Sequence, residues 1–472
     1  MGEIGISMSL DEVFNPCSVV VVGASPDERK MGHQCVKSLV EAFDGEIYVV
    51  NPHASCILGI NSYKSVRQIP GSVDLAIVVV PSSAVLSAVR ECAEKGVKGA
   101  VIITGGFKEA SAAERDVDTG GELLQEHLAA LAEEAGMKII GPNTFGFVNV
   151  GVINASFSPV FNGLRKGRIA MVGQSGGVCH IFAYMAMNEA VGLNKLVGLG
   201  NRCNVEFYDI LEYLEEDDET DTIAMHIEGI DEPRKLMNAA RRVAKKKPVV
   251  AYKVGRTRAV ERAALSHTGS MAGEYKLYDA AFRQSGVVTV NSCEELFDAA
   301  KILSLCQDCL PKGRKVAIIS TQAGPGIILT DECTSGGLQL ARFSEATEKK
   351  LKRLLPPLTI RENPVDMAFI RDAGLWLEVV RTVLADDGVD ALIIFNLYHP
   401  SFLLPPEEIV DARRCYGKPL IMCTSFPHEL MLKEKIKLEE EGVPVYSTPE
   451  RGAKALITLI KYAEMKRRTK GG

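Results

Sequence analysis

The sequence predicts an α/β protein made of three consecutive doubly wound units, each with a parallel sheet. From residue 10 onward, short runs rich in Val and Ile alternate with longer amphipathic runs. The short runs are almost continuously apolar, which is typical of parallel strands that are buried on both faces. This alternation of strands and helices is interrupted at two places and then begins again. A chain of 472 residues is also too long for one hydrophobic core.

The first unit alternates predicted strands with predicted helices. The strands are the apolar runs Ser18–Gly23, Glu46–Asn51, Asp74–Pro81 and Ala100–Thr104. The helices are the amphipathic runs His33–Phe43, Ser83–Lys95 and Ala112–Ala135. Because the carboxyl ends of parallel strands meet at one edge of a sheet, we expect the turns after these strands to form the binding edge.

The second and third units repeat this alternation. A loop-like stretch, Asn154–Gly167, precedes the second unit, whose strands are predicted at Arg168–Gly173, Leu193–Gly200, Thr222–Glu228 and Pro248–Lys253. This unit is expected to end near Leu305, with Cys306–Gly313 as a linker. The third unit begins at Arg314–Thr321, and its further strands are predicted near Leu338–Phe343, Val389–Asn396, Lys418–Cys423 and Val443–Tyr446.

The composition is that of an ordinary soluble globular protein, with 46% hydrophobic and 24% charged residues. A net charge of -6 argues against nucleic acid as a partner. The first residues lack the features of a signal peptide, and no stretch reaches the ~18 to 20 apolar residues of a membrane span. The twelve cysteines are scattered, which fits free thiols in the cytoplasm. The pair Cys306 and Cys309 is weak evidence for zinc or redox chemistry, and no metal site is expected.

The stretch Ser266–Gly273, read as S-H-T-G-S-M-A-G, is a candidate catalytic loop. It falls between the predicted strand Pro248–Lys253 and a helical run, Glu274–Ser285, at the carboxyl end of a strand. The imidazole of His267 is partly unprotonated near neutral pH and can act as a nucleophile. Its small neighbours would leave it accessible to a phosphoryl group. The alternative is an exposed loop histidine without a role.

The first unit lacks the fingerprint of a dinucleotide site. Its first turn reads Gly23-Ala24-Ser25, not G-x-G-x-x-G, and the second strand ends in Asn51 without a carboxylate for the NAD ribose. A nicotinamide-dependent enzyme is therefore the weakest interpretation. The short turn can still present backbone N–H groups to a phosphate, with Lys30 adding positive charge. Gly and Pro at the later strand ends would allow close approach of an extended ligand, although each could be a turn residue only.

The ordered motifs resemble those of the ADP-forming acyl-CoA synthetases, which are relatives of succinyl-CoA synthetase. V-V-G-A-S-P, V-V-N-P-H, G-G-F-K-E and I-I-G-P-N resemble the family's CoA-binding domain. V-G-Q-S-G-G, G-L-G-N, H-I-E-G-I and S-H-T-G-S-M-A-G resemble its first ligase domain, and E-N-P-V-D-M resembles its second. The resemblance implies a Rossmann-like CoA-binding domain over 8–152 and two flavodoxin-like ligase domains over 160–305 and 312–468.

The resemblance also implies a reaction and its residues. An acyl-CoA reacts with phosphate to give an acyl phosphate and CoA, the acyl phosphate phosphorylates His267, and the phosphohistidine converts ADP to ATP. Glu228 would orient and stabilise the phosphohistidine, and Ser175, Gly176 and Gly177 would bind the phosphoryl group at a helix start. The CoA contacts that the resemblance implies are Gly23, Ser25, Lys30, Pro81, Gly105, Phe107, Pro142 and Asn143.

Nothing in the chain resembles the ATP-grasp domains that the family needs, and no Walker loop is present. The resemblance therefore implies an α subunit whose β subunit supplies the ATP/ADP and Mg²⁺ sites, in an α₂β₂ assembly. The chain departs from the family's G-P-N-C and G-N-K-A at Thr144 and at Arg202-Cys203, which leaves the acyl specificity open. The alternative function is a non-catalytic sensor of CoA or acyl-CoA with the same fold.

Overall fold

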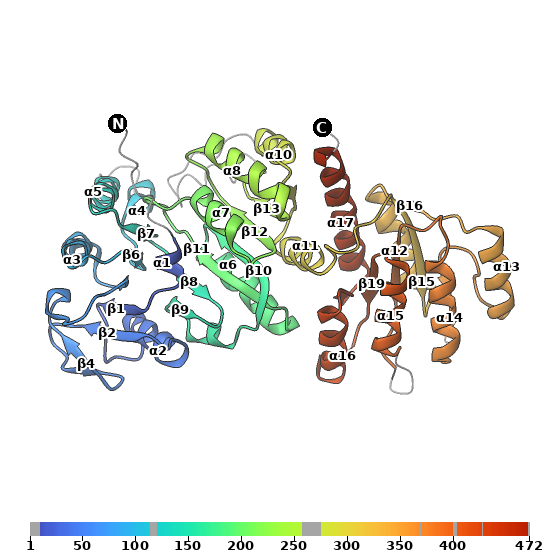
Figure 1. Ribbon diagram of the computed structural model, residues 1–472, viewed down its shortest axis with the longest axis horizontal. Coiled ribbons are helices and arrows are strands. Elements are labelled where there is room, and N and C mark those ends of the chain that lie inside the picture. The colour runs from blue at the N-terminus through green and yellow to red at the C-terminus, as the bar shows by residue number, and fades with distance from the viewer. Residues whose placement is uncertain are drawn as a thin grey trace. The chain divides into compact units, whose positions relative to one another are not determined.

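Three sheets flanked by helices make up the computed structural model (Figure 1). The structure describes residues 10–113, 120–256, 275–368, 370–399, 404–426 and 428–470. Contacts divide the chain into two compact units, Met1–Cys293 with the first two sheets and Glu294–Gly472 with the third. Most strand pairs in each sheet are parallel, so the predicted class of three doubly wound α/β units is confirmed.

The first sheet has the order β3-β4-β2-β1-β5-β6-β7. Its strands are β1 (Ser18–Val22), β2 (Glu46–Val50), β3 (Cys56–Ile57), β4 (Ile60–Tyr63), β5 (Leu75–Val78), β6 (Gly99–Ile102) and β7 (Lys138–Ile140). The chain leaves β1 toward β2 on one side and returns to β5 on the other. This reversal makes the carboxyl ends of β1 and β5 the switch point of the sheet, which is the usual position of a ligand in such sheets.

The two faces of the first sheet are covered differently. Its helices are α1 (Asp11–Phe14), α2 (Met31–Ala42), η1 (Val66–Gln68), α3 (Ser82–Lys95), α4 (Lys108–Ala113) and α5 (Gly121–Glu134). In β1, Val20 and Val22 pack in a cluster with α3 and α5. Val19 and Val21 face the opposite way, into a core shared with α1, α2 and the second sheet. Full burial on both faces explains why these strands read as unbroken apolar runs.

The second sheet has the order β14-β13-β12-β10-β11-β8-β9, with β8 and β9 antiparallel at its edge. Its strands are β8 (Gly146–Asn149), β9 (Ile153–Ser156), β10 (Lys166–Gly173), β11 (Leu193–Gly198), β12 (Thr222–Ile227), β13 (Val249–Lys253) and β14 (Val288–Thr289). Its helices are η2 (Pro159–Gly163), α6 (Gly176–Glu189), α7 (Phe207–Glu216), α8 (Pro233–Lys246) and α10 (Tyr275–Gln284).

The predicted loop at Asn154–Gly167 is wrong, because this stretch contains most of β9, all of η2 and the start of β10. Its polar residues read as a loop, yet Asn154 and Ser156 are buried and bond to each other at 2.6 Å. Strand β8 lies within the predicted first domain, 8–152, but pairs with β11 of the second sheet. The single helix predicted over Ala112–Ala135 is also wrong, since α4 ends at Ala113 and α5 begins at Gly121.

The third sheet has the path β16-β15-β18-β19-β20, with β17 also paired to β15. Its strands are β15 (Lys315–Ser320), β16 (Gln339–Leu340), β17 (Val365–Asp366), β18 (Ala391–Phe395), β19 (Leu420–Cys423) and β20 (Val445–Tyr446). Its helices are α12 (Ala323–Ser335), α13 (Glu345–Leu354), α14 (Ala373–Leu384), α15 (Pro406–Tyr416), α16 (His428–Glu440) and α17 (Pro449–Lys470). The motif E-N-P-V-D-M forms β17 and its flanking turns.

Helix α11 (Cys293–Leu305) lies at the end of the predicted domain 160–305 and forms polar contacts with residues of the third unit. Its buried Lys301 donates to the carbonyl of Val445 at 2.7 Å and pairs with Glu439. Its Asp298 accepts from Arg451 at 2.6 Å. The following Cys306 and Cys309 are buried, so this stretch is packed and is not a linker.

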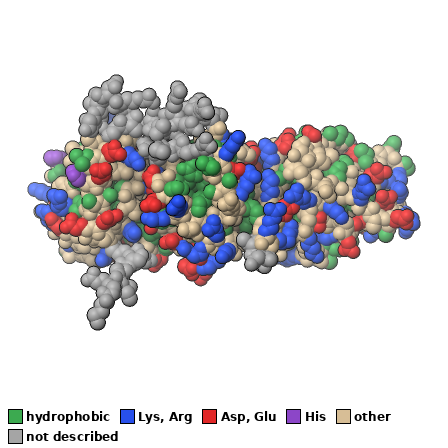
Figure 2. All heavy atoms as spheres, turned by 90° about the horizontal axis from the view of Figure 1, so that it is seen from above, with side chains coloured by type: hydrophobic (Ala, Val, Ile, Leu, Met, Phe, Trp, Pro, Cys, Tyr) green, Lys and Arg blue, Asp and Glu red, His purple; other side chains and the backbone are tan. Residues whose placement is uncertain are grey.

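The charged side chains on the surface and the free cysteines agree with what the composition predicts. Figure 2 shows basic and acidic side chains interspersed over the face that it draws, as 54 basic and 60 acidic residues lead one to expect. All twelve cysteines lie in the described ranges, and each is a free thiol. No helix within those ranges combines the length and the apolar character needed to cross a lipid bilayer.

Candidate functional site

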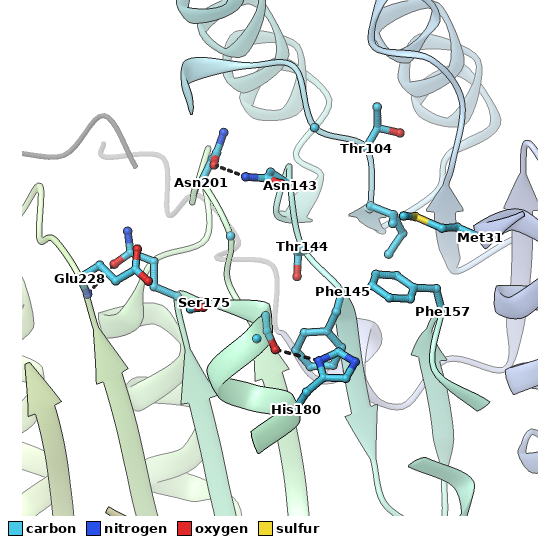
Figure 3. A pocket seen from close by; sticks show the side chains of 16 residues that line it. Met31, Thr104, Asn143, Thr144, Phe145, Phe157, Ser175, His180, Asn201 and Glu228 are labelled. Carbon is cyan, nitrogen blue, oxygen red and sulfur yellow. Dashed lines mark hydrogen bonds between the residues drawn. The ribbon is translucent and has the colours of Figure 1, made fainter. Parts of the chain in front are cut away.

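A cavity of about 650 Å³ lies where strand ends of the first and second sheets meet (Figure 3). The first sheet contributes the turns after β6 and β7, and the second contributes the turns after β10, β11 and β12. Six of the residues singled out from the sequence line it, namely Gly105, Asn143, Ser175, Gly176, Gly177 and Glu228. The cavity therefore joins the predicted CoA-binding edge to the predicted phosphate-binding helix start.

Helix α6 begins at the cavity with three small residues. Ser175 is its N-cap, and the Ser175 Oγ accepts a long hydrogen bond, 3.5 Å, from the N–H of Val178. Gly176 and Gly177 form the first turn, whose N–H groups have no acceptor within the helix. These groups and the helix dipole favour an anion at this point.

The fold itself leaves room for a side chain at both glycines. A Cβ at Gly176 would lie 3.6 Å from the Phe145 ring, and one at Gly177 would lie 3.7 Å from Ser175 Oγ, both ordinary contacts. At Gly173, by contrast, a Cβ would collide with Cys179 Sγ at 2.4 Å. Packing therefore requires a glycine at position 173. Packing does not require the glycines at 176 and 177, and their effect is that no side chain covers the backbone at this wall of the cavity.

Glu228 follows β12, and its backbone is held at several points. Gln174 Oε1 accepts from the N–H groups of both Glu228 and Gly229 at 3.0 Å. Lys253 Nζ donates to the carbonyl of Glu228 at 2.8 Å. Burial lowers the pKa of the Lys253 ammonium to about 8, while the Glu228 carboxylate opposes that shift. The result is a half-buried carboxylate fixed at one end of the cavity, opposite the aromatic side chains in Figure 3.

Asparagines connect the two sheets at the roof of the cavity. Asn143 Nδ2 donates to Asn201 Oδ1 at 3.4 Å, and the N–H of Asn201 donates to the carbonyl of Pro142 at 2.9 Å. Asn201 Nδ2 in turn donates to Glu109 and to Gln125, the latter at 3.0 Å. The turn after β7 is thereby tied to the turn after β11, which fixes the width of the cavity.

The remaining predicted CoA residues lie along the same sheet edge but do not line this cavity. Gly23 and Ser25 form the turn after β1, and Lys30 is the exposed N-cap of α2. Gly23 has a φ of +94°, and a Cβ there would lie 2.4 Å from the Val79 carbonyl oxygen. Pro81 is the exposed N-cap of α3, beside the switch point of the sheet.

Two of the predicted CoA residues offer no exposed side chain. The ring of Phe107 is 0% exposed and packs in the core with α3 and α5, so only its backbone can face a ligand. Pro142 is also buried, in the turn after β7. In the G-G-F motif, Phe107 therefore packs in the core, while Gly105 leaves the edge of the sheet without a side chain.

Sequence reasoning missed the apolar end of the cavity, which consists of Met31, Phe145, Phe157 and His180. Figure 3 shows these side chains at the end away from Glu228. Their only signal in the sequence is that His180 lies one helical turn after Gly176, on the same face of α6.

Family models describe all three parts of the chain. A CoA binding domain matches residues 17–149, a succinyl-CoA ligase like flavodoxin domain matches 166–303, and a Ligase-CoA domain matches 316–415. The chain is 39% identical over 465 residues to the acetate–CoA ligase [ADP-forming] II subunit alpha of Pyrococcus furiosus, which covers 96% of this chain and 98% of that protein. The chain belongs to the ADP-forming acetate–CoA ligases.

Two further comparisons agree with this family. The chain is 39% identical to acetate–CoA ligase [ADP-forming] I of Archaeoglobus fulgidus, over 97% of this chain and 64% of that protein. A solved structure of the dinucleotide forming acetyl-coenzyme A synthetase 1 of Ca. Korarchaeum cryptofilum, in complex with phosphate and ADP, superposes with a TM-score of 0.86. That alignment covers 98% of both chains at 32% identity. The chain corresponds to the α-subunit-type region of these ligases, within the succinyl-CoA ligase superfamily.

The two departures from the ligase motifs have structural partners. Thr144 Oγ1 donates to the Gly198 carbonyl at 2.6 Å and accepts from the N–H of Gly146. Arg202 Nη1 donates to the carbonyl of Gly229, next to Glu228, at 3.1 Å. His267, the predicted nucleophile of the ligase, lies outside the described residues.

The buried His226 of this ligase predicts a loss of stability in acid. It is 1% exposed at the end of β12, and burial, with Lys253 adding to it, lowers its pKa from 6.5 to about 4. Between these values the unfolded chain binds more protons than the folded chain, so the stability present above pH 6.5 is lost as the pH falls toward 4. We expect the free energy of unfolding to drop by about 2 kcal/mol between pH 7 and pH 4.5 through this residue.

Urea unfolding at both pH values measures this contribution. His226→Gln removes the titrating group, so its unfolding free energy should depend less steeply on pH than that of the wild type. Equal pH slopes in the two proteins would contradict the assignment to His226.

Proposed function

We propose that this chain is the α subunit of an ADP-forming acyl-CoA synthetase that works through a phosphohistidine. A phosphate oxygen attacks the acyl carbonyl carbon, the C–S bond breaks, and CoA leaves with a proton. A ring nitrogen of His267 then attacks the phosphorus of the acyl phosphate, and the carboxylate leaves. The β-phosphate oxygen of ADP finally attacks the phosphohistidine, which breaks the P–N bond and gives ATP.

One observation supports this proposal above the others. A single cavity brings together Gly105 and Asn143 from the CoA-binding domain, the start of α6, and Glu228. The acyl thioester and the phosphate would have to meet in such a place. The bare N–H groups of Gly176 and Gly177 would hold the transferring phosphoryl group, and one such contact can contribute ~2.7 to 4 kcal/mol to a transition state.

Glu228 has the properties of a positioning group for a histidine. Its backbone is fixed by Gln174 and Lys253, while its carboxylate faces the cavity. A carboxylate that accepts one ring N–H fixes the tautomer and leaves the second nitrogen free to attack. It would also stabilise the charge that the ring acquires on phosphorylation.

CoA would lie along the carboxyl edge of the first sheet. We assign its phosphates to the turn at Gly23 and Ser25 and to Lys30, and its thiol end to Gly105 and Asn143. Pro81 would flank the chain of CoA between these points, while Phe107 and Pro142 would contribute backbone only. Lys30 is exposed and Ser25 caps its own turn by accepting from the N–H of Asp27 at 3.1 Å.

We further propose that a separate ATP-grasp β subunit binds ADP/ATP and Mg²⁺, and that the two subunits form an α₂β₂ heterotetramer in the cytoplasm. The similarity to an α subunit from Pyrococcus furiosus over 98% of its length supports a β partner. The relative with phosphate and ADP supports these two substrates.

Radioactive labelling tests the proposed chemistry on the chain together with its proposed β subunit. With an acyl-CoA and ³²P-phosphate but no ADP, the chain should acquire label that is lost in acid and retained in base, as expected for a phosphohistidine. A thermal-shift titration should show binding of CoA and none of NADH, since a ligand at ~100 times its Kd stabilises by about 2.7 kcal/mol. A chain that binds CoA but takes up no label with any acyl-CoA would be a sensor and would contradict the proposal.

A further inference from the structure

The backbone at Glu228 and Gly229 is held at all four of its polar groups. Gln174 Oε1 accepts from both N–H groups at 3.0 Å. The carbonyl of Glu228 accepts from Lys253 Nζ at 2.8 Å, and the carbonyl of Gly229 accepts from Arg202 Nη1 at 3.1 Å. A side chain on a backbone fixed in this way keeps its position in the cavity. Of the three residues that hold it, the lysine lies on β13, the strand that precedes the candidate catalytic loop.

The ammonium of Lys253 contacts the chain on both sides of segment 257–274, which carries His267 and lies outside the described residues. Nζ donates to the carbonyl of Val254 at 2.6 Å, just before that segment. Nζ also lies 5.1 Å from the ring centre of Tyr278 in α10, just after the segment, which is within the range of a cation–π contact. One ammonium therefore contacts the end of β12, the chain that enters the His267 segment and the helix that follows it.

Burial of this ammonium is unfavourable for the fold, and an apolar side chain of the same length would avoid the cost. Lys253 is 3% exposed and donates to two backbone carbonyls. Lys195, on β11 of the same sheet, is equally buried but pairs directly with the carboxylate of Asp217 at 2.8 Å. A buried cation that holds the backbone of a candidate catalytic carboxylate is more typical of a functional site than of a core.

We propose that Lys253 is a positioning residue for phosphoryl transfer, whose ammonium holds the Glu228 carboxylate and the chain leading to His267 in the relative position that the transfer needs. This inference rests on the proposed function, because it assumes that His267 is phosphorylated beside Glu228. The lysine itself touches neither the substrates nor the reacting atoms. Its charge matters, since a hydrogen bond from a charged donor is roughly twice as strong as one from a neutral donor.

Lys253→Met keeps the length of the side chain and removes its charge and its donors. We expect kcat for ATP formation, measured with the proposed β subunit, to fall about 100-fold, while the KM for acyl-CoA and for phosphate stays within about threefold. Lys195→Met is the matched control, because Lys195 is also buried and lies 5.4 Å from a tyrosine ring centre. Neither Lys195 nor its partner Asp217 lines the cavity. Both variants should lose stability, and the control should keep the kcat of the wild type.

The pH dependence of the wild type is a second test that needs no variant. Burial lowers the pKa of the Lys253 ammonium to about 8, and the Glu228 carboxylate opposes this shift. The other titratable groups that face it are His226 of β12 and Tyr278 of α10. The rate of phosphohistidine labelling should fall about tenfold or more between pH 7 and pH 9.5, as the ammonium loses its proton. Above pH 8 the unfolded chain binds more protons at this residue, so its titration stabilises the fold while it lowers the rate.

The outcomes separate this inference from the function on which it rests. If the wild type takes up no acid-labile label and forms no ATP, the proposed function fails and the role of Lys253 fails with it. If the wild type is active and Lys253→Met keeps its kcat, or both lysine variants lose it equally, the inference is wrong and the proposed function stands. A labelling rate that is constant from pH 7 to pH 9.5 would also overturn the inference, even if Lys253→Met does not fold.

Discussion

Replacement of His267 by alanine is expected to abolish turnover while leaving the binding of CoA unchanged. The proposed reaction passes every phosphoryl group through this ring, so no other side chain can complete the transfer. Removing the nucleophile of a covalent mechanism costs about 10⁴-fold or more. The CoA binding domain model matches residues 17–149, outside the segment that carries His267, so we expect the Kd of CoA to stay within about twofold.

The experiment uses the chain together with the proposed nucleotide-binding β subunit, with ATP formation as the readout. His127→Ala removes an exposed histidine from α5 and should leave turnover intact. The acid-labile label described above should be absent from His267→Ala and present in the control. Appreciable ATP formation by His267→Ala would rule out the phosphohistidine mechanism.

The sequence was sufficient for the class of the fold because its parallel strands are buried on both faces. All five residues of β1 and all six of β12 are buried, and all of them are apolar except Ser18, Thr222 and His226. The edge strand β9 is also buried, but its sequence does not indicate this burial. Strand β9 alternates apolar and polar residues, and its Asn154 and Ser156 satisfy each other in a way that only the folded chain provides.

The contacts of α11 also depend on the folded structure. Its sequence does not indicate which residues its charged side chains pair with. The buried pairs of Lys301 with Glu439 and of Asp298 with Arg451 connect it to residues that are more than a hundred positions away. Such pairs become visible only when both partners are placed in space.

The sequence was sufficient to identify the site residues that follow strands, but not the other residues that line the cavity. Ser175, Gly176, Gly177 and Glu228 follow strands of one sheet, so their convergence follows from the topology. His180 and Phe157 come from a helix and from a turn after an edge strand. Their meeting depends on the packing of η2 and β9 against α6, which no local pattern encodes.

Gly177→Ala is expected to lower kcat/KM about 100-fold without destabilising the chain. In the described structure the new methyl group would contact only Ser175 Oγ, at 3.7 Å, so the fold can accept it. Alanine also has the higher helix propensity, by up to about 1 kcal/mol in a helix interior. The methyl group would, however, occupy the bare wall of the cavity and displace the phosphoryl group from the N–H groups of α6. A misplacement of about 1 Å can cost 100-fold in rate.

Gly374→Ala is the matched control, because Gly374 is likewise the second residue of its helix, α14, after the N-cap Asp372. Its new Cβ would lie 3.3 Å from Asp372 Oδ1, the N-cap acceptor of the Leu375 N–H, so this cap has to shift slightly. Gly177→Ala should unfold at or above the wild-type temperature, and only Gly177→Ala should raise the KM for phosphate and lower kcat. Equal kinetics in the two variants would mean that the glycines of α6 do not bind the phosphoryl group. A lower unfolding temperature for Gly177→Ala would mean that the fold, and not the reaction, requires this glycine.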